Sequence, residues 1–131
     1  TTVGEALLLL GDAVGQFRED YCRMLEAVVA TDVQPYICTI YRPDFPDEDF
    51  QSMTSTALGL FNDVIVEEAS LRLLPILDIR AIFTDSGDYA NPIEPSVQGG
   101  QKLADEIAGL IDDWGLSTNR GSLIISEKEV N

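Results

Sequence analysis

The sequence DYANPIEPSVQGGQKLA, residues 88–104, is the most informative part of this chain. It follows an apolar run, residues 74–80, whose short length and aliphatic character predict a buried strand. It leads into an amphipathic pattern over 97–114, which predicts a helix with Ser96 as its N-cap. The segment 81–95, rich in Asp, Gly, Asn and Pro, is therefore a loop between a strand and a helix.

Upstream of this stretch, the apolar spacing predicts alternating helices and strands. The run 35–41 predicts a second buried strand, and a helix capped by Asp47 or Asp49 and ending near Leu71 connects it to the strand 74–80. A connection of this length favours parallel pairing through a right-handed crossover. Further upstream we predict a helix over 14–31 and a shorter helical stretch over 3–10, with bends at Gly11 and Gly15.

The predicted sheet is incomplete, because two strands with near-continuous apolar character need covered faces and paired edges. We therefore expect residues 1–115 to be part of an α/β domain that another segment, a second subunit or another copy of the chain completes. The tail 116–131 is polar except for Leu123, Ile124 and Ile125. That triplet is either a short added strand or a hydrophobic clasp on a neighbouring element.

The composition excludes several classes of partner. The chain has 131 residues with 23 acidic and 8 basic side chains, a net charge of −15, which disfavours nucleic acid and anionic lipid surfaces. Its longest apolar stretch, residues 6–10, is far too short to span a membrane, and no basic region with a cleavage site precedes it. Cys22 and Cys38 fit no disulfide framework or zinc pattern, so we predict reduced core thiols, a cytoplasmic location and no cofactor.

Five short segments follow one another in an order that resembles a known family. They are CTIY at 38–41, FNDVI at 61–65, LPILDIR at 74–80, NPIEPS at 91–96 and the glycine pair 99–100. In order and spacing they resemble the C-terminal portion of the SGNH/GDSL hydrolases, and most closely a subgroup with Ile-Glu-Pro-Ser in place of an acid-x-x-His loop. The resemblance implies a three-layer α/β/α fold with a flavodoxin-like parallel sheet, and serine-dependent hydrolysis of esters or acyl groups.

The sequence departs from the family pattern at the catalytic positions. There is no histidine; Glu94 occupies the family's His position and Asn91 its acid position. One reading places a lost nucleophile turn at residues 7–13, with Ala13 in the serine position, but the apolar spacing favours a helix there. We therefore expect either a hydrolase-like protein whose nucleophile lies on a segment outside this chain, or a non-catalytic module for self-association or ligand binding.

Two residues of the loop are candidates for catalysis. Glu94 is suited to orient or activate water, and its alternative role is a carboxylate stabilised by the positive end of the helix over 97–114. Asn91 either hydrogen-bonds Glu94 or forms an Asx-turn before the following proline. The resemblance further implies a substrate-binding surface around the loop, formed by Asp88, Tyr89, Pro92 and Ser96.

Carboxylates near the end of the strand 74–80 raise a third possibility. Asp78, Asp85 and Asp88 surround the edge at which open α/β sheets bind ligands, and with Glu94 they are compatible with a hard cation such as Mg²⁺. No ligand spacing enforces such a site, so we predict no metal. Gly99 and Gly100 weaken the start of the last helix and indicate close packing or approach of a ligand there.

Overall fold

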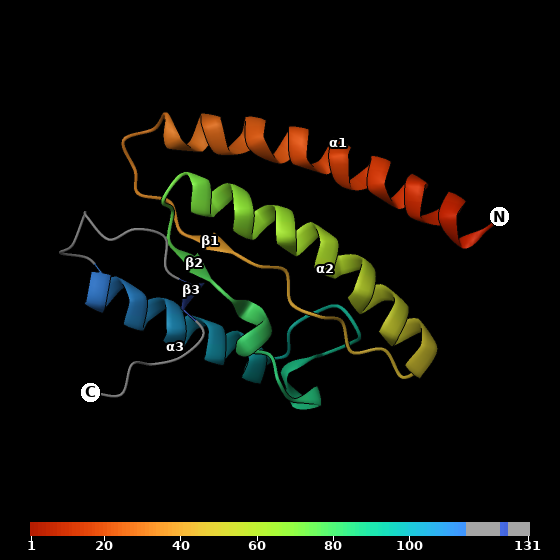
Figure 1. Cartoon of the computed structure of the whole chain (residues 1–131). Helices are drawn as coiled ribbons and strands as arrows, with labels where there is room; N and C mark the ends of the chain where they lie inside the picture. The colour runs from red at the N-terminus through yellow and green to blue at the C-terminus, as the bar shows by residue number, and fades with distance from the viewer. Residues whose placement is uncertain (115–123, 126–131) are drawn as a thin grey trace.

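Three long helices dominate the computed structural model, which describes residues 1–114 and 124–125 (Figure 1). The helices α1 (Val3–Val29), α2 (Glu48–Leu71) and α3 (Val97–Trp114) contain 27, 24 and 18 residues. The strands β1 (Ile37–Cys38), β2 (Ile76–Leu77) and β3 (Ile124–Ile125) contain two residues each and pair in parallel in the order β1-β2-β3. Short 3₁₀ turns, η1 (Ile79–Ala81) and η2 (Ser86–Asp88), lie between β2 and α3.

The predicted three-layer α/β/α fold with a parallel sheet of the flavodoxin or SGNH type is wrong. The chain is mostly helical, and strands of two residues are shorter than the three to ten residues usual in globular sheets. The paired strands form a narrow strip, with α1 and α2 on one side and α3 on the other (Figure 1). The helix that connects β1 to a parallel β2 is as predicted.

A side chain ends the first strand early. Beyond β1, the backbone N–H of Ile40 donates to Oδ1 of Asn62 at 2.7 Å, and Nδ2 of Asn62 donates to the carbonyl of Ile40 at 2.8 Å. Asn62 is buried on α2. Because its amide satisfies both backbone groups of Ile40, this part of the chain needs no neighbouring strand.

A capping carboxylate ends the second strand. The predicted strand 74–80 stops after Leu77, where the side chain of Asp78 accepts a hydrogen bond from the backbone N–H of Arg80 at 3.1 Å. This contact starts η1, so the backbone turns instead of continuing the ladder. The predicted edge of an extended sheet is replaced by a 3₁₀ turn.

The N-terminal helix is continuous, whereas the sequence pattern predicts two helical stretches with bends. Thr2 and Glu5 form a capping box, in which Glu5 N–H donates to Thr2 Oγ1 at 3.1 Å and Thr2 N–H donates to Glu5 Oε2 at 2.7 Å. Gly11 and Gly15 lie inside α1, where each costs only about 1 kcal/mol relative to alanine. Residues 7–13 are therefore helical and form no nucleophile turn.

The second helix begins and ends as its sequence predicts. Asp47 caps it, and its Oδ1 accepts from the N–H of Phe50 at 2.7 Å. At the other end, the N–H of Leu74 donates to the carbonyl of Ala69, and Leu73 adopts a φ of 55°. This left-handed residue directs the chain from α2 into β2.

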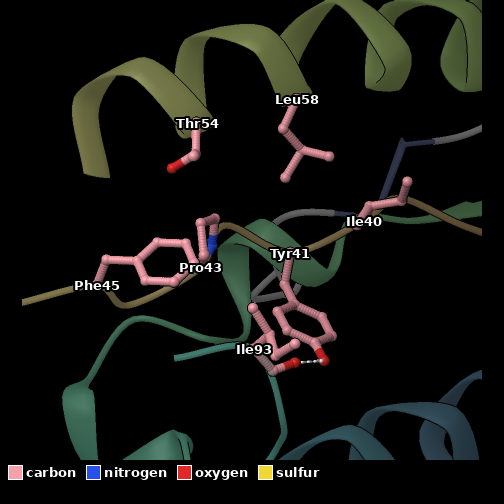
Figure 2. Close-up of a pocket in the computed structure, with 7 residues that line it drawn as sticks. All are labelled: Ile40, Tyr41, Pro43, Phe45, Thr54, Leu58 and Ile93. Atoms are coloured by element: carbon pink, nitrogen blue, oxygen red, sulfur yellow. Dashed lines mark hydrogen bonds between the residues drawn. The ribbon is translucent and has the colours of Figure 1, made fainter. Parts of the chain in front are cut away.

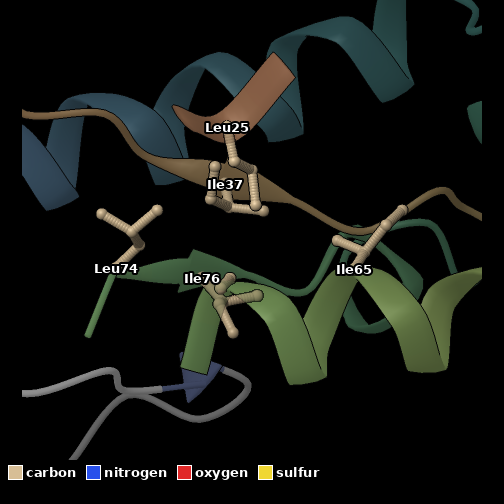
Figure 3. Packing of buried hydrophobic residues seen from close by; sticks show 6 residues of the cluster. Leu25, Ile37, Ile65, Leu74 and Ile76 are labelled. Atoms are coloured by element: carbon tan, nitrogen blue, oxygen red, sulfur yellow. The ribbon is translucent and has the colours of Figure 1, made fainter. Parts of the chain in front are cut away.

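Alternate residues of β2 face two separate cores. Ile76 belongs to the first, with Leu25 of α1 and Ile65 of α2 (Figure 3). Leu77 belongs to the second, in which Phe83 and Leu110 pack beneath the loop that follows η1. The second core connects β2 to α3 and thereby fixes both ends of the segment that resembles the hydrolase loop.

Several predicted core positions are exposed. Cys38 is exposed and Cys22 half-buried, and neither forms a disulfide. The apolar side chains of Met53 on α2 and Ile111 on α3 are exposed as well, to 60% and 58%. The side chain of Trp114 lies outside the described part of the chain, as does all of the predicted tail 116–131 except β3.

No helix within residues 1–114 combines the length and the apolar character that a membrane crossing requires.

Candidate functional site

The loop from Asp88 to Ser96 is closed at its base by backbone contacts. The N–H of Ser96 donates to the carbonyl of Asp88 at 2.8 Å, and Tyr89 and Pro95 form an antiparallel bridge. Nearer the tip, Ala90 N–H donates to the carbonyl of Glu94 at 2.8 Å. The segment that the sequence singles out is thus a closed loop with Glu94 near its tip.

Asn91 holds the tip of this loop in place. Its Oδ1 accepts hydrogen bonds from the N–H groups of Ile93 and Glu94, both at 3.0 Å, and its Nδ2 donates to Glu94 Oε2 at 2.5 Å. Both contacts considered for Asn91 therefore occur together: the Asx-turn and the bond to Glu94. The Glu94 side chain is exposed, so its carboxylate is accessible from solvent.

Ser96 uses its hydroxyl to cap α3. Its Oγ donates to the carbonyl of Gly87 at 2.6 Å and accepts from the N–H of Gly99 at 3.1 Å. Both contacts are to backbone groups, as expected of an N-cap. The hydroxyl is therefore engaged in starting the helix rather than directed at Glu94.

Asp88 lies beneath the loop and is fully buried. Its carboxylate accepts hydrogen bonds from the N–H groups of Thr84 and Asp85 at 3.1 Å, from Gln98 Nε2 at 3.0 Å and from Lys102 Nζ at 2.7–2.8 Å. The Lys102 ammonium is the largest cause that lowers the pKa of this carboxyl to about 2, with Gln98 and the two backbone donors adding to it. Asp88 is therefore ionised, and its carboxylate oxygens are hydrogen-bonded to groups of the same chain.

Gly99 allows α3 to approach the base of the loop. A Cβ on Gly99 would lie 2.2 Å from the carbonyl oxygen of Asp88, which is a backbone atom that cannot move away easily. The same carbonyl accepts from Ser96 N–H. Gly99 therefore serves close packing of α3 against the loop. Gly100 has no such role, because a Cβ there would meet nothing within 4 Å.

Tyr89 and Pro92 connect the loop to the segment after β1. The hydroxyl of Tyr89 donates to the carbonyl of Arg42 at 2.6 Å, and the carbonyl of Pro92 accepts from the N–H of Asp44 at 2.9 Å. The ring of Tyr89 also lies edge-on to Tyr41, with ring centroids 6.0 Å apart. These contacts bring the Glu94 loop beside residues 41–45, although Tyr89 and Arg42 are 47 residues apart in the sequence.

An apolar pocket of about 320 Å³ opens between that segment, the loop and α2 (Figure 2). Its polar side-chain atoms are both engaged with the backbone: Tyr41 Oη donates to the carbonyl of Ile93 at 2.7 Å, and Thr54 Oγ1 donates to the carbonyl of Phe50 at 2.8 Å. The residues that line the pocket are Ile40, Tyr41, Pro43, Phe45, Thr54, Leu58 and Ile93. Its volume lies at the lower end of the range typical of small-molecule sites.

Asp78 is engaged in an ion pair with Arg80. Its carboxylate accepts from Arg80 Nε and from one terminal nitrogen of Arg80, both at 2.8 Å, and from Thr39 Oγ1 at 2.8 Å. Arg80 is the main cause that lowers the pKa of Asp78, and Thr39 acts in the same direction. In the part of the chain that the structure describes, no three acidic or cysteine side chains converge as a cation site would require.

The structure places the predicted residues in three pairs. Asn91 and Glu94 meet at the tip, and Tyr89 and Pro92 join the loop to residues 42–44. Asp88 and Ser96 instead form the base. The pocket residues of α2, Thr54 and Leu58, carry no sequence signal of their own, because helical periodicity shows which residues share a face but not what that face encloses.

Comparison of the chain with protein-family models, with curated proteins and with solved structures gave no match.

Proposed function

We propose that this chain contributes the Glu94 loop and an adjoining apolar pocket to an ester-hydrolysing site of the SGNH/GDSL type. In this proposal the serine nucleophile comes from a segment or a partner chain outside residues 1–131. The order of the short segments from CTIY to the glycine pair supports the family, and the loop geometry supports the place of the chemistry.

One observation carries the proposal: an exposed glutamate, held by Asn91, directly follows a residue that lines an apolar pocket. Asn91 holds Glu94 through its side chain and through the turn, and the neighbouring Ile93 lines the pocket. An ester that places its apolar part in such a pocket brings its polar centre to the rim. Convergence of an apolar cavity with a few fixed polar groups is the usual arrangement of small-molecule sites.

Glu94 would act on water rather than on a serine hydroxyl. A carboxylate is a weak base for an alcohol but readily accepts a hydrogen bond from water and orients it. Asn91 would keep the carboxylate at the rim, since it bonds one of its two oxygens and leaves the other for solvent. Ser96 is not the nucleophile, because its hydroxyl caps α3.

The second candidate is a non-catalytic module that binds a ligand or associates with itself. It is favoured by the way the loop satisfies its own polar groups, since Ser96, Tyr89 and Asp88 are all engaged within the chain. Such a module would use the same pocket without turnover.

Turnover of short p-nitrophenyl esters tests the two candidates. The full chain is assayed alone and with any chain that co-purifies, and a fluorophosphonate probe reports whether either contains an activated serine. We expect turnover and labelling only with the partner present, and Glu94→Gln should reduce turnover at least about tenfold. Glu19→Gln, an exposed glutamate on α1, is the matched control.

Unchanged turnover in Glu94→Gln would reject the proposed role of this residue. Absence of both labelling and turnover in the presence of co-purifying chains would favour the non-catalytic module.

We also propose a cytoplasmic location, which the two free cysteines support because thiols stay reduced there.

A further inference from the structure

The apolar pocket has no cationic side chain among its lining residues. Its lining is aliphatic and aromatic apart from the hydroxyl of Thr54 and that of Tyr41, and both hydroxyls donate to backbone carbonyls. A ligand therefore meets apolar surface, and its own polar groups find no free side-chain donor within the lining. Burial of an unpaired charge in such surroundings is strongly unfavourable.

The sequence around the pocket adds negative charge. Residues 40–58 contain four acidic side chains and only Arg42 as a basic one, and the loop 88–96 contains Asp88 and Glu94 with no basic residue. The whole chain carries a net charge of −15. This field opposes an anionic ligand both on approach and when bound.

The size of the pocket limits the ligand to a compact group. A dry apolar cavity of about 150 Å³ holds one benzene molecule, so a pocket of about 320 Å³ suits a group of about ten non-hydrogen atoms. Phe45 and Tyr41 offer ring surfaces from one chain segment, and Leu58 of α2 lies across from Tyr41 (Figure 2). A single aromatic ring with a short substituent fits between them.

We infer that the pocket selects a compact, uncharged aromatic or branched acyl group and rejects the corresponding carboxylate. This inference deepens the proposed function, on which it rests for the identification of the ligand as an ester. A site with this selectivity would retain the neutral ester and release the anionic acid that hydrolysis produces. The bound acyl group would be held by apolar contact with Ile93, Phe45 and Leu58.

Binding of methyl benzoate and benzoate at pH 7 to the full chain tests the inference. The two probes share one ring and differ in charge, and ¹H–¹⁵N NMR titration measures weak binding without any turnover. We expect a Kd for methyl benzoate of about 0.1–1 mM, typical of ligands with so few atoms. Benzoate should bind at least about tenfold more weakly.

A pair of variants localises the binding. Ile93→Ala removes pocket surface and should weaken methyl benzoate binding about threefold to tenfold, and it should leave the fold intact because Ile93 is 61% exposed. Ile111→Ala on α3 is the matched control, since Ile111 is 58% exposed and lies outside the pocket. Its Kd should equal that of the unmodified chain.

Equal or tighter binding of benzoate would overturn the inference, as would absence of binding of both probes or equal affinities in the two alanine variants. Failure of the proposed function gives a different result. Selective binding of methyl benzoate without turnover or fluorophosphonate labelling would reject the hydrolase function and support the pocket assignment, and turnover that does not depend on Glu94 would reject the role of Glu94 alone. Turnover that depends on Glu94 without selective binding would reject the pocket assignment alone.

Discussion

At the base of the Asp88–Ser96 loop a carboxylate is fully buried, whereas at its tip a carboxylate is exposed to solvent. Asp88 accepts hydrogen bonds from two backbone N–H groups and from the side chains of Gln98 and Lys102. Glu94 is contacted through its side chain by Asn91. The two acids lie six residues apart in the sequence and have opposite surroundings.

The difference in burial indicates different roles: Asp88 stabilises the loop, and Glu94 is available for chemistry. A buried charge must be fully paired, so the many partners of Asp88 fix the base and resist change. An exposed carboxylate keeps its capacity to bind water or a ligand, so Glu94 has the freedom that a site residue needs. Changes at the base should therefore lower stability strongly, and changes at the tip should alter function with little effect on stability.

Asp88→Asn should have the largest effect. The amide cannot accept all four hydrogen bonds, and it leaves the ammonium of Lys102 half-buried without its counter-charge. We expect the Tm to fall by about 10 °C, measured by far-UV circular dichroism. Asp105→Asn on α3, the helix that carries Lys102, is the control, because Asp105 is exposed, and it should change Tm by less than about 2 °C. Similar Tm values for the two variants would show that the base is not a stabilising centre.

Acid should weaken the same contact. The pKa of Asp88 is about 2 in the folded chain against an ordinary 3.8, so its contribution to stability is complete above about pH 4 and is lost as the pH falls toward 2. The urea midpoint of the unmodified chain should exceed that of Asp88→Asn most above pH 4, and the gap should fall to about half or less by pH 2.5. Glu68 and Asp78 have lowered pKa values as well, so both proteins lose stability in acid for other reasons. A gap that is independent of pH would show that the charge of Asp88 contributes nothing.

Gly99→Ala should destabilise the base by a steric route. The new Cβ would contact the Asp88 carbonyl and force α3 away from it, at a cost of about 2 kcal/mol in the free energy of unfolding. Gly100→Ala has open space and should instead stabilise the helix by about 0.5–1 kcal/mol. Urea denaturation of the two neighbouring variants gives the comparison. Stabilisation by both would contradict the close approach of α3 to the loop.

Local signals made some elements predictable from the sequence. Asp47 and the apolar spacing place α2, and Ser96 places the start of α3, because caps and helical periodicity depend on residues close in sequence. The i,i+3 spacing of Asn91 and Glu94 likewise makes their contact expected. The continuity of α1 was not predictable in the same way, because Gly11 and Gly15 locally indicate bends. The helix starts at the capping box of Thr2 and continues through both glycines.

Contacts distant in sequence decided the rest. Strand β1 is short because Asn62 occupies the backbone groups of Ile40, 22 residues away, and no pattern within 35–41 contains that information. The pairing of Asp88 with Lys102 goes with the close approach of α3 to Asp88 at Gly99, for which the sequence offers both close packing and ligand approach as explanations. The pocket depends on α2 lying over residues 40–45 (Figure 2).

The tip should show the smallest change in stability and the clearest change in function. Asn91→Ala removes the Asx-turn and should lower the free energy of unfolding by about 0.5–1 kcal/mol, because these hydrogen bonds are exposed. Glu94→Gln keeps a partner for Asn91 and should change it by less than about 0.5 kcal/mol, while ester turnover falls at least about tenfold. Urea denaturation and the p-nitrophenyl ester assay on the same preparations separate the two effects. If Glu94→Gln instead lowered stability as much as Asp88→Asn, the exposed carboxylate would belong to the support of the loop, and the distinction between base and tip would fail.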